Sequence, residues 1–177
     1  MRFHWRYRDE RVSGGGRGQI RLAPPDSLRL DYVATLGLAS GAGVVIGDSL
    51  VWADPDKDFR ALVRGAAILW AALGTARPPA ADAIVSGRQD SGQVIWRFVQ
   101  GADTLDYVAS AAAPRRLEAE WRRAGKIEAR SRTLYDAQAR PASARIDVPE
   151  EQARFELTIV AVDTAAVIAP ALWRSRR

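Results

Sequence analysis

The sequence predicts an α+β domain: one strongly curved antiparallel sheet of about eleven strands, an unclosed β-barrel, covered by a helical segment. Three observations predict it. Most candidate strands place apolar residues on one parity and charges on the other. The apolar spacing changes to a helical one only between about residues 58 and 74. No linker or change of composition divides the chain, so residues 1–177 are expected to form a single domain.

The first strand shows the alternation most clearly. Within Met1 to Arg8, Phe3, Trp5 and Tyr7 share one side of an extended chain, and basic residues occupy the other. Ser13 to Gly18 follows, with four glycines in six residues, and this composition predicts a turn. The segment lacks the Lys-Ser/Thr pair of a P-loop, so we do not expect it to bind phosphate.

Further strands are separated by short turns. Gln19 to Ala23 and Ser27 to Val33 flank a Pro-Pro-Asp turn, and Gly47-Asp48-Ser49 joins two runs as a hairpin. The second half of the chain is almost entirely strand, beginning with Ala81 to Gly87 and Gln93 to Gln100. Consecutive strands of this kind are expected to pair with their neighbours in an antiparallel sheet.

One segment has the period of a helix. From Asp58 to Leu73 the apolar residues recur at helical spacing, Gly74 follows, and Gly65 is a candidate break. Three aspartates precede it at alternate positions, as in a calcium loop. The sixth position of that loop, Phe59, is not glycine, and the twelfth is not glutamate. Negative charge at a helix N-terminus explains these acids better, and no metal site is expected.

Composition excludes several classes of function. The net charge is +5 and only two of the 26 basic residues are lysine, but the 21 acids are interspersed among the bases, which favours an arginine-rich solvated surface. There is no cysteine, which excludes disulfides, zinc thiolate sites and thiol nucleophiles. The longest apolar stretch, Ala66 to Leu73, is far short of the ~20 residues that span a bilayer. The N-terminus lacks the apolar region of a signal peptide, so any leader is expected to be absent from this chain.

Part of the first half resembles a known family. The residues that carry the resemblance are Gly16 to Leu22, Pro25 to Tyr32, Gly37, the hairpin Gly47 to Trp52, and Asp54-Pro55. Their order, a glycine-led strand, a proline-led Arg-Leu strand and a Gly-Asp hairpin ending in Trp before a proline, is similar to that of the LolA/LolB-like lipoprotein-carrier superfamily. Residues 16–55 are covered; the rest agrees in topology and length.

The resemblance implies a half-barrel with a helical lid over about residues 58–74 and a cavity for acyl chains. It implies non-enzymatic binding or transfer of a lipid or lipoprotein acyl chain in the periplasm or at the periplasmic face of the outer membrane. A monomer without cofactor is expected, with peripheral membrane contact and other envelope proteins as further partners. Family members usually open on an amphipathic helix and this chain opens on a strand. It also lacks the N-terminal cysteine that anchors LolB-like members.

The candidate ligand-binding residues are the large apolar side chains expected on the apolar face. They are Trp5, Tyr32, Leu62, Leu69, Trp70, Trp96, Phe98, Trp121, Tyr135 and Phe155. For each of them, ordinary core packing is the alternative, because an acyl site differs from a core mainly in being incompletely filled.

The residue pattern also bears on three other functions. A packed structural or protein-binding envelope domain would have the same pattern without a ligand. Nucleic-acid binding needs arginines and aromatics on one exposed face, whereas here they have opposite parity, so no nucleic acid is expected. Catalysis has little support, because His4 is the sole histidine and stands on the charged parity with no nucleophile elbow or metal-spaced cluster, so no catalytic residue is assigned.

Overall fold

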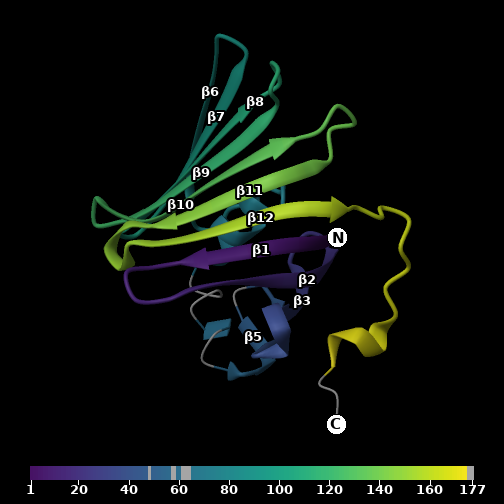
Figure 1. Cartoon of the computed structure of the whole chain (residues 1–177). Helices are drawn as coiled ribbons and strands as arrows, with labels where there is room; N and C mark the ends of the chain where they lie inside the picture. The colour runs from purple at the N-terminus through teal and green to yellow at the C-terminus, as the bar shows by residue number, and fades with distance from the viewer. Residues whose placement is uncertain (48, 57–58, 61–64, 175–177) are drawn as a thin grey trace.

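The chain forms one antiparallel sheet of twelve strands that curls without closing, with a short helix on its inner face (Figure 1). This computed structural model describes residues 1–47, 49–56, 59–60 and 65–174. The strands are β1 (Arg2–Arg8), β2 (Ser13–Ala23), β3 (Ser27–Ala34), β4 (Ser40–Ile46), β5 (Ser49–Asp54), β6 (Ile84–Asp90), β7 (Gln93–Gln100), β8 (Asp103–Ser110), β9 (Arg116–Arg123), β10 (Lys126–Tyr135), β11 (Pro141–Val148) and β12 (Ala153–Ala161). The helix α2 spans Ala66–Ala72, and three single 3-10 turns are η1 (Thr35–Gly37), η2 (Pro149–Glu151) and η3 (Pro170–Trp173). The predicted curved antiparallel sheet with a helix is confirmed, with twelve strands rather than eleven.

The order of the strands explains where the helix lies. The sheet runs β5-β4-β3-β2-β1-β12-β11-β10-β9-β8-β7-β6, so β1 and β12 pair in the middle and β5 and β6 are the two edges. Each half is a meander of hairpins. The chain must therefore pass from one edge to the other between β5 and β6. Helix α2 lies on this connection and packs against β9, β10 and β11.

Alternation along the strands gives the sheet an apolar inner face, which we define as the face that contacts α2, and a charged outer face. In β1, Phe3 is buried and Trp5 is half-buried on the inner side, while His4 and Arg6 are exposed on the outer side. The same parity holds in β10, where Thr133 is buried. The prediction of one apolar and one polar face is confirmed.

The glycine-rich segment is strand and not the predicted turn. Residues Ser13 to Gly18 form the first half of β2, and the chain reverses earlier, where Asp9 Oδ1 accepts hydrogen bonds from the backbone N–H groups of Arg11 (2.7 Å) and Val12 (2.6 Å). Glycine is required in this part of β2 because the aromatic rings of β1 lie against its backbone. A Cβ atom on Gly18 would lie 2.3 Å from the Phe3 ring and 2.9 Å from a backbone oxygen of β3. Aromatic rings of β1 therefore lie over the glycines of β2.

The helical segment and one strand differ from their predicted bounds. Within the predicted helix Asp58 to Leu73, α2 begins after Gly65, and residues 57–58 and 61–64, Leu62 among them, lie outside the described residues. Gly74, with a φ of 84°, follows the helix as expected. The strand predicted over Ala81 to Gly87 is β6, which lies about three residues later along the chain.

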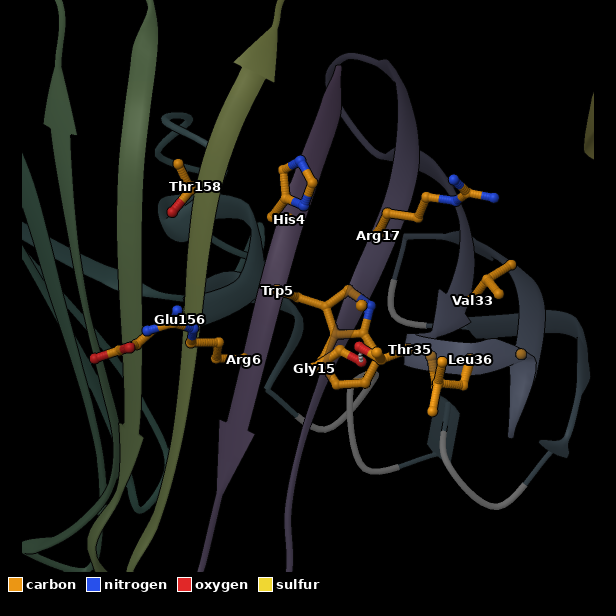
Figure 2. Close-up of a pocket in the computed structure, with 13 residues that line it drawn as sticks. His4, Trp5, Arg6, Gly15, Arg17, Val33, Thr35, Leu36, Glu156 and Thr158 are labelled. Carbon is orange, nitrogen blue, oxygen red and sulfur yellow. Dashed lines mark hydrogen bonds between the residues drawn. The ribbon is translucent and has the colours of Figure 1, made fainter.

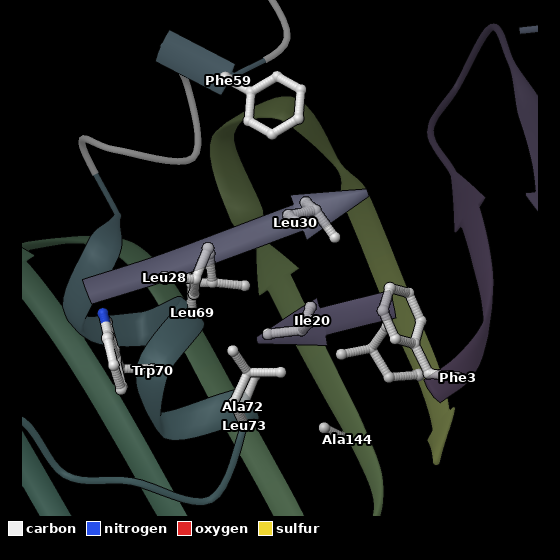
Figure 3. Close-up of a cluster of buried hydrophobic side chains, with 11 residues drawn as sticks. Phe3, Ile20, Leu28, Leu30, Phe59, Leu69, Trp70, Ala72, Leu73 and Ala144 are labelled. Carbon is white, nitrogen blue, oxygen red and sulfur yellow. The ribbon is translucent and has the colours of Figure 1, made fainter. Parts of the chain in front are cut away.

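Two clusters of buried side chains lie on the inner face. The first joins Leu69 and Trp70 of α2, with Leu73 directly after the helix, to Ile20 of β2 and Leu28 of β3 (Figure 3). The second joins the opposite side of α2 to β8, β9 and β10: Ile68, Ala71, Tyr107, Leu117, Ala119 and Ala129. The helix therefore fills the space between the two halves of the curved sheet.

The C-terminal segment packs on the outer face at β3. Arg29 of β3, only 2% exposed, donates hydrogen bonds to Asp31 and to the carbonyl oxygen of Leu172 (2.7 Å), and its guanidinium lies 5.3 Å from the centroid of the Trp52 ring. This arginine is buried on the charged parity because η3 covers it.

Replacing Gly18 with alanine should destabilise the fold by about 1–3 kcal/mol, because the buried Phe3 ring and the β3 backbone leave no room for a methyl group. Gly87→Ala is the matched control, since the nearest atom to its Cβ would be 3.5 Å away. The measurement is the free energy of unfolding in urea. Equal stability of the two variants would show that ring packing does not require Gly18.

Candidate functional site

Side chains of the sheet hold the end of the helix and the chain that follows it. Thr133 Oγ1 donates a hydrogen bond to the carbonyl oxygen of Ala71 (2.7 Å), and the Tyr135 hydroxyl donates to that of Gly74 (2.9 Å). The Tyr107 hydroxyl accepts a bond from the backbone N–H of Arg77 (3.3 Å). The last carbonyls of a helix have no partner within the helix, so these contacts fix α2 over β8 to β10.

One group of predicted ligand-binding residues lies near the middle of the sheet. The Trp5 ring stacks on Phe155 with centroids 6.1 Å apart and meets Tyr32 edge-on at 6.0 Å. Tyr32 in turn lies 6.2 Å from Phe59. Trp5, Tyr32 and Phe155 are each half-buried, so their outer edges remain accessible.

A second group lies toward the β6 edge. Trp96 and Phe98 of β7 and Trp121 of β9 pack against the second buried cluster, and the centroids of Phe98 and of Tyr107 in that cluster are 5.7 Å apart. The Trp121 indole donates to Asp103 Oδ1 (3.1 Å). All three predicted residues are half-buried.

The remaining predicted residues lie under or on the helix. Leu69 and Trp70 are fully buried in the first cluster, and Tyr135 is half-buried beneath the end of α2. Leu62 lies outside the described residues. The sequence analysis expected these side chains to surround one cavity. The structure instead separates the strand aromatics into two groups, because α2 packs between them.

The inner face beside the β6 edge is the most accessible apolar surface near these residues. Val85 of β6 stands opposite Phe98 in the register and is 54% exposed. Gly87 stands opposite Trp96 and places no side chain beside it. Every residue of β6 is exposed, and α2 packs further along, over β9 to β11. We define Val85, Trp96, Phe98, Leu105 and Trp121 as the apolar edge, which is the candidate site.

A hollow lies on the outer face of the sheet, the face opposite the apolar edge. It has a volume of about 840 Å³ and is lined by residues of β1, β2 and β12 and by the turn after β3 (Figure 2). His4, Arg6 and Arg17 are among its lining residues. The sequence analysis treated His4 as an isolated surface residue, because the pairing of β1 with β12, which brings residues 4 and 158 together, is not visible in the sequence.

No metal site or membrane-spanning helix is found among the described residues. Their His, Asp and Glu side chains form no group of three that could hold a metal ion. None of the helices in this part of the chain has both the length and the apolar character to cross a bilayer.

Tyr107 is the central residue that the sequence analysis missed. It lies on the inner parity of β8 with no accessible surface, and burial raises its pKa to about 12 against a weaker opposing effect from the Arg77 N–H. A tyrosine that shares its parity with Leu105 and Ala109 gives no signal in the sequence that separates it from an ordinary strand residue.

Thr133→Val should lower the free energy of unfolding by about 1 kcal/mol, because it removes a buried hydrogen bond to α2 without changing the volume of the side chain. Thr158→Val, at an exposed outer position of β12, is the control and should have little effect. Urea titration monitored by tryptophan fluorescence measures both.

Stability should fall as the pH rises from 10 to 12. The unfolded chain loses the Tyr107 proton near pH 10, but the folded chain keeps it until about pH 12, so deprotonation favours unfolding across this window by roughly 2 kcal/mol. Tyr107→Phe should flatten the slope, leaving the part due to Tyr7, whose pKa burial raises to about 12, and to Tyr135, whose pKa burial also raises. An unchanged slope in Tyr107→Phe would contradict the assignment.

Comparison of the whole chain with protein-family models and with curated proteins finds no match.

Proposed function

We propose that the protein binds the acyl chain of a lipid or lipoprotein on the apolar edge and carries it, without catalysis, within the bacterial cell envelope. The observation that carries the proposal is the half-burial of Trp96, Phe98 and Trp121 beside the exposed Val85. Soluble domains rarely leave contiguous aromatic surface open unless it binds something.

The chemistry of the apolar edge suits a chain of methylene groups. Its side chains are aliphatic or aromatic, and the Trp121 indole Nε1 is already bonded to Asp103, so this indole needs no polar group from the ligand. Covering apolar surface contributes about 25 cal/mol per Å², or roughly 0.8 kcal/mol for each buried methylene. An acyl chain gains this without any cofactor.

The resemblance of residues 16–55 to lipoprotein carriers supports the envelope as the setting, with the periplasm or the periplasmic face of the outer membrane as the compartment. Helix α2 covers the inner face over β9 to β11, where Thr133 and Tyr135 fix its end, and leaves the β6 side of that face open to a ligand. The buried Leu69 and Trp70 stabilise this arrangement and do not contact the ligand.

Val85→Asp should weaken uptake of a fluorescent fatty acid by about tenfold or more, because a carboxylate placed against an acyl chain loses its hydration. Ile84→Asp is the matched control: it is the preceding residue of β6, 72% exposed on the outer face, and should bind as the unaltered protein does. Fluorescence titration measures both, and native mass spectrometry shows whether lipid co-purifies.

Absence of uptake and of co-purified lipid in the unaltered protein would favour the packed structural or protein-binding domain instead. Equal losses in the two variants would show that charge, and not the apolar edge, controls uptake. Both positions are exposed, so a failure to fold does not explain either result.

A further inference from the structure

Charges on the outer face are arranged in rows that cross the strands. Asp106, Glu120, Arg130, Asp147 and Arg154 stand opposite one another in successive strands from β8 to β12. Ion pairs link them to one another or to neighbours, as between Arg154 and Asp147 (2.9 Å) and between Arg97 and Asp106 (2.7 Å). In this part of the sheet, arginines are neutralised by carboxylates of the protein itself.

The rows of ion pairs stop at β1. Arg2, Arg6, Arg8 and Arg17 are all exposed on the outer face of β1 and β2, and none forms an ion pair with another described residue. On the β12 side, Glu156 stands opposite Arg6, but the two are not within ion-pair distance; the β2 side offers no carboxylate at all. The outer positions of β2 opposite β1 are Ser13, Gly15, Arg17 and Gln19, which include no carboxylate.

The same strands form the hollow of about 840 Å³, which we call the outer trough. Gly15 stands opposite Arg6 and leaves the floor without a side chain, while the Thr35 hydroxyl donates to the Gly15 carbonyl (2.8 Å) at one rim. His4 and Thr158 face each other across β1 and β12 (Figure 2). The acidic residue among those that line the trough, Glu156, lies at the Arg6 side, so an anion is best placed toward Arg17.

We propose that the outer trough binds a phosphate-ester anion through Arg6 and Arg17, with His4 and Thr158 as further polar contacts. Guanidinium groups match pairs of phosphate oxygens, and these two arginines are not engaged with carboxylates, so a ligand displaces no ion pair. The anion is either a soluble phosphate compound or the head group of a phospholipid, which share this chemistry. The site lies on the face opposite the apolar edge and does not depend on acyl-chain binding.

His4 is a direct probe of the outer trough, because it is the sole histidine of the chain and its ring protons need no assignment. Titration of the untagged protein with pyrophosphate at constant pH should shift these proton NMR signals in a saturable way. Sedimentation with phosphatidylcholine vesicles, with and without phosphatidylglycerol, tests the head group as the source of the anion.

The variant Arg6→Gln with Arg17→Gln removes the proposed contacts at two exposed positions. Its matched control is Arg130→Gln with Arg132→Gln, which makes the same change of net charge on the same face, at residues paired with Glu120 and Glu118. Each basic residue near an anionic surface contributes roughly fivefold, so vesicle binding should weaken about 30-fold in the first variant and little in the control. The His4 shift should likewise be lost only in the first.

Saturation by pyrophosphate supports a soluble ligand, and binding only to vesicles that contain phosphatidylglycerol supports a head group. The proposal is overturned if the His4 signals do not move and vesicle binding falls equally in both variants, which would indicate attraction by net charge alone. Tighter retention of a single-stranded oligonucleotide than of either probe would overturn it in favour of nucleic-acid binding.

Discussion

The structure depends on covering a wide apolar face with a short helix. Twelve strands at the usual spacing of about 4.8 Å form a sheet roughly 50 Å wide, whereas the seven residues of α2 span only about 10 Å. A flat sheet would leave most of its inner face in water. Curling brings Ile20 and Leu28 from one half, and Tyr107 from the other, against opposite sides of the same helix. Helix α2 does not reach β6, so the apolar edge remains as an uncovered part of the inner face.

Glycine in β2 links the two faces of the sheet. The inner glycines, Gly16 and Gly18, let the Trp5 and Phe3 rings lie close to the backbone, which thickens the core without lengthening the helix. Gly15, directly before Gly16, faces outward and leaves the floor of the outer trough without a side chain. The same glycine-rich stretch of β2 therefore gives space to the core on its inner face and leaves Arg6 of β1 without a side chain opposite it on its outer face.

Alternating polarity was sufficient to predict the antiparallel sheet, its two faces and the helical segment before Gly74, because each is a local property of the chain. The prediction of a turn over Ser13 to Gly18 was wrong, because the requirement for glycine beneath the Phe3 ring becomes visible only when β1 and β2 lie side by side. The same limit applies to the sites. The separation of the aromatics by α2, the burial of Arg29 beneath η3 and the position of His4 opposite Thr158 all depend on residues far apart in the sequence.

The outer face is rich in arginine because arginine side chains form ion pairs with carboxylates across its strands. Along β8 to β12 several carboxylates contact arginines from neighbouring strands, as Asp106 of β8 does with Arg97 of β7 (2.7 Å) and Arg122 of β9 (3.2 Å), so one acid links three strands. Exposed pairs of this kind add little stability each, but like charges directly opposite one another are unfavourable. Arg8 and Arg154 stand in that relation where β1 meets β12. Ser13 stands on the other side of Arg8, so no carboxylate of β2 offsets this repulsion at the seam that joins the two halves of the sheet.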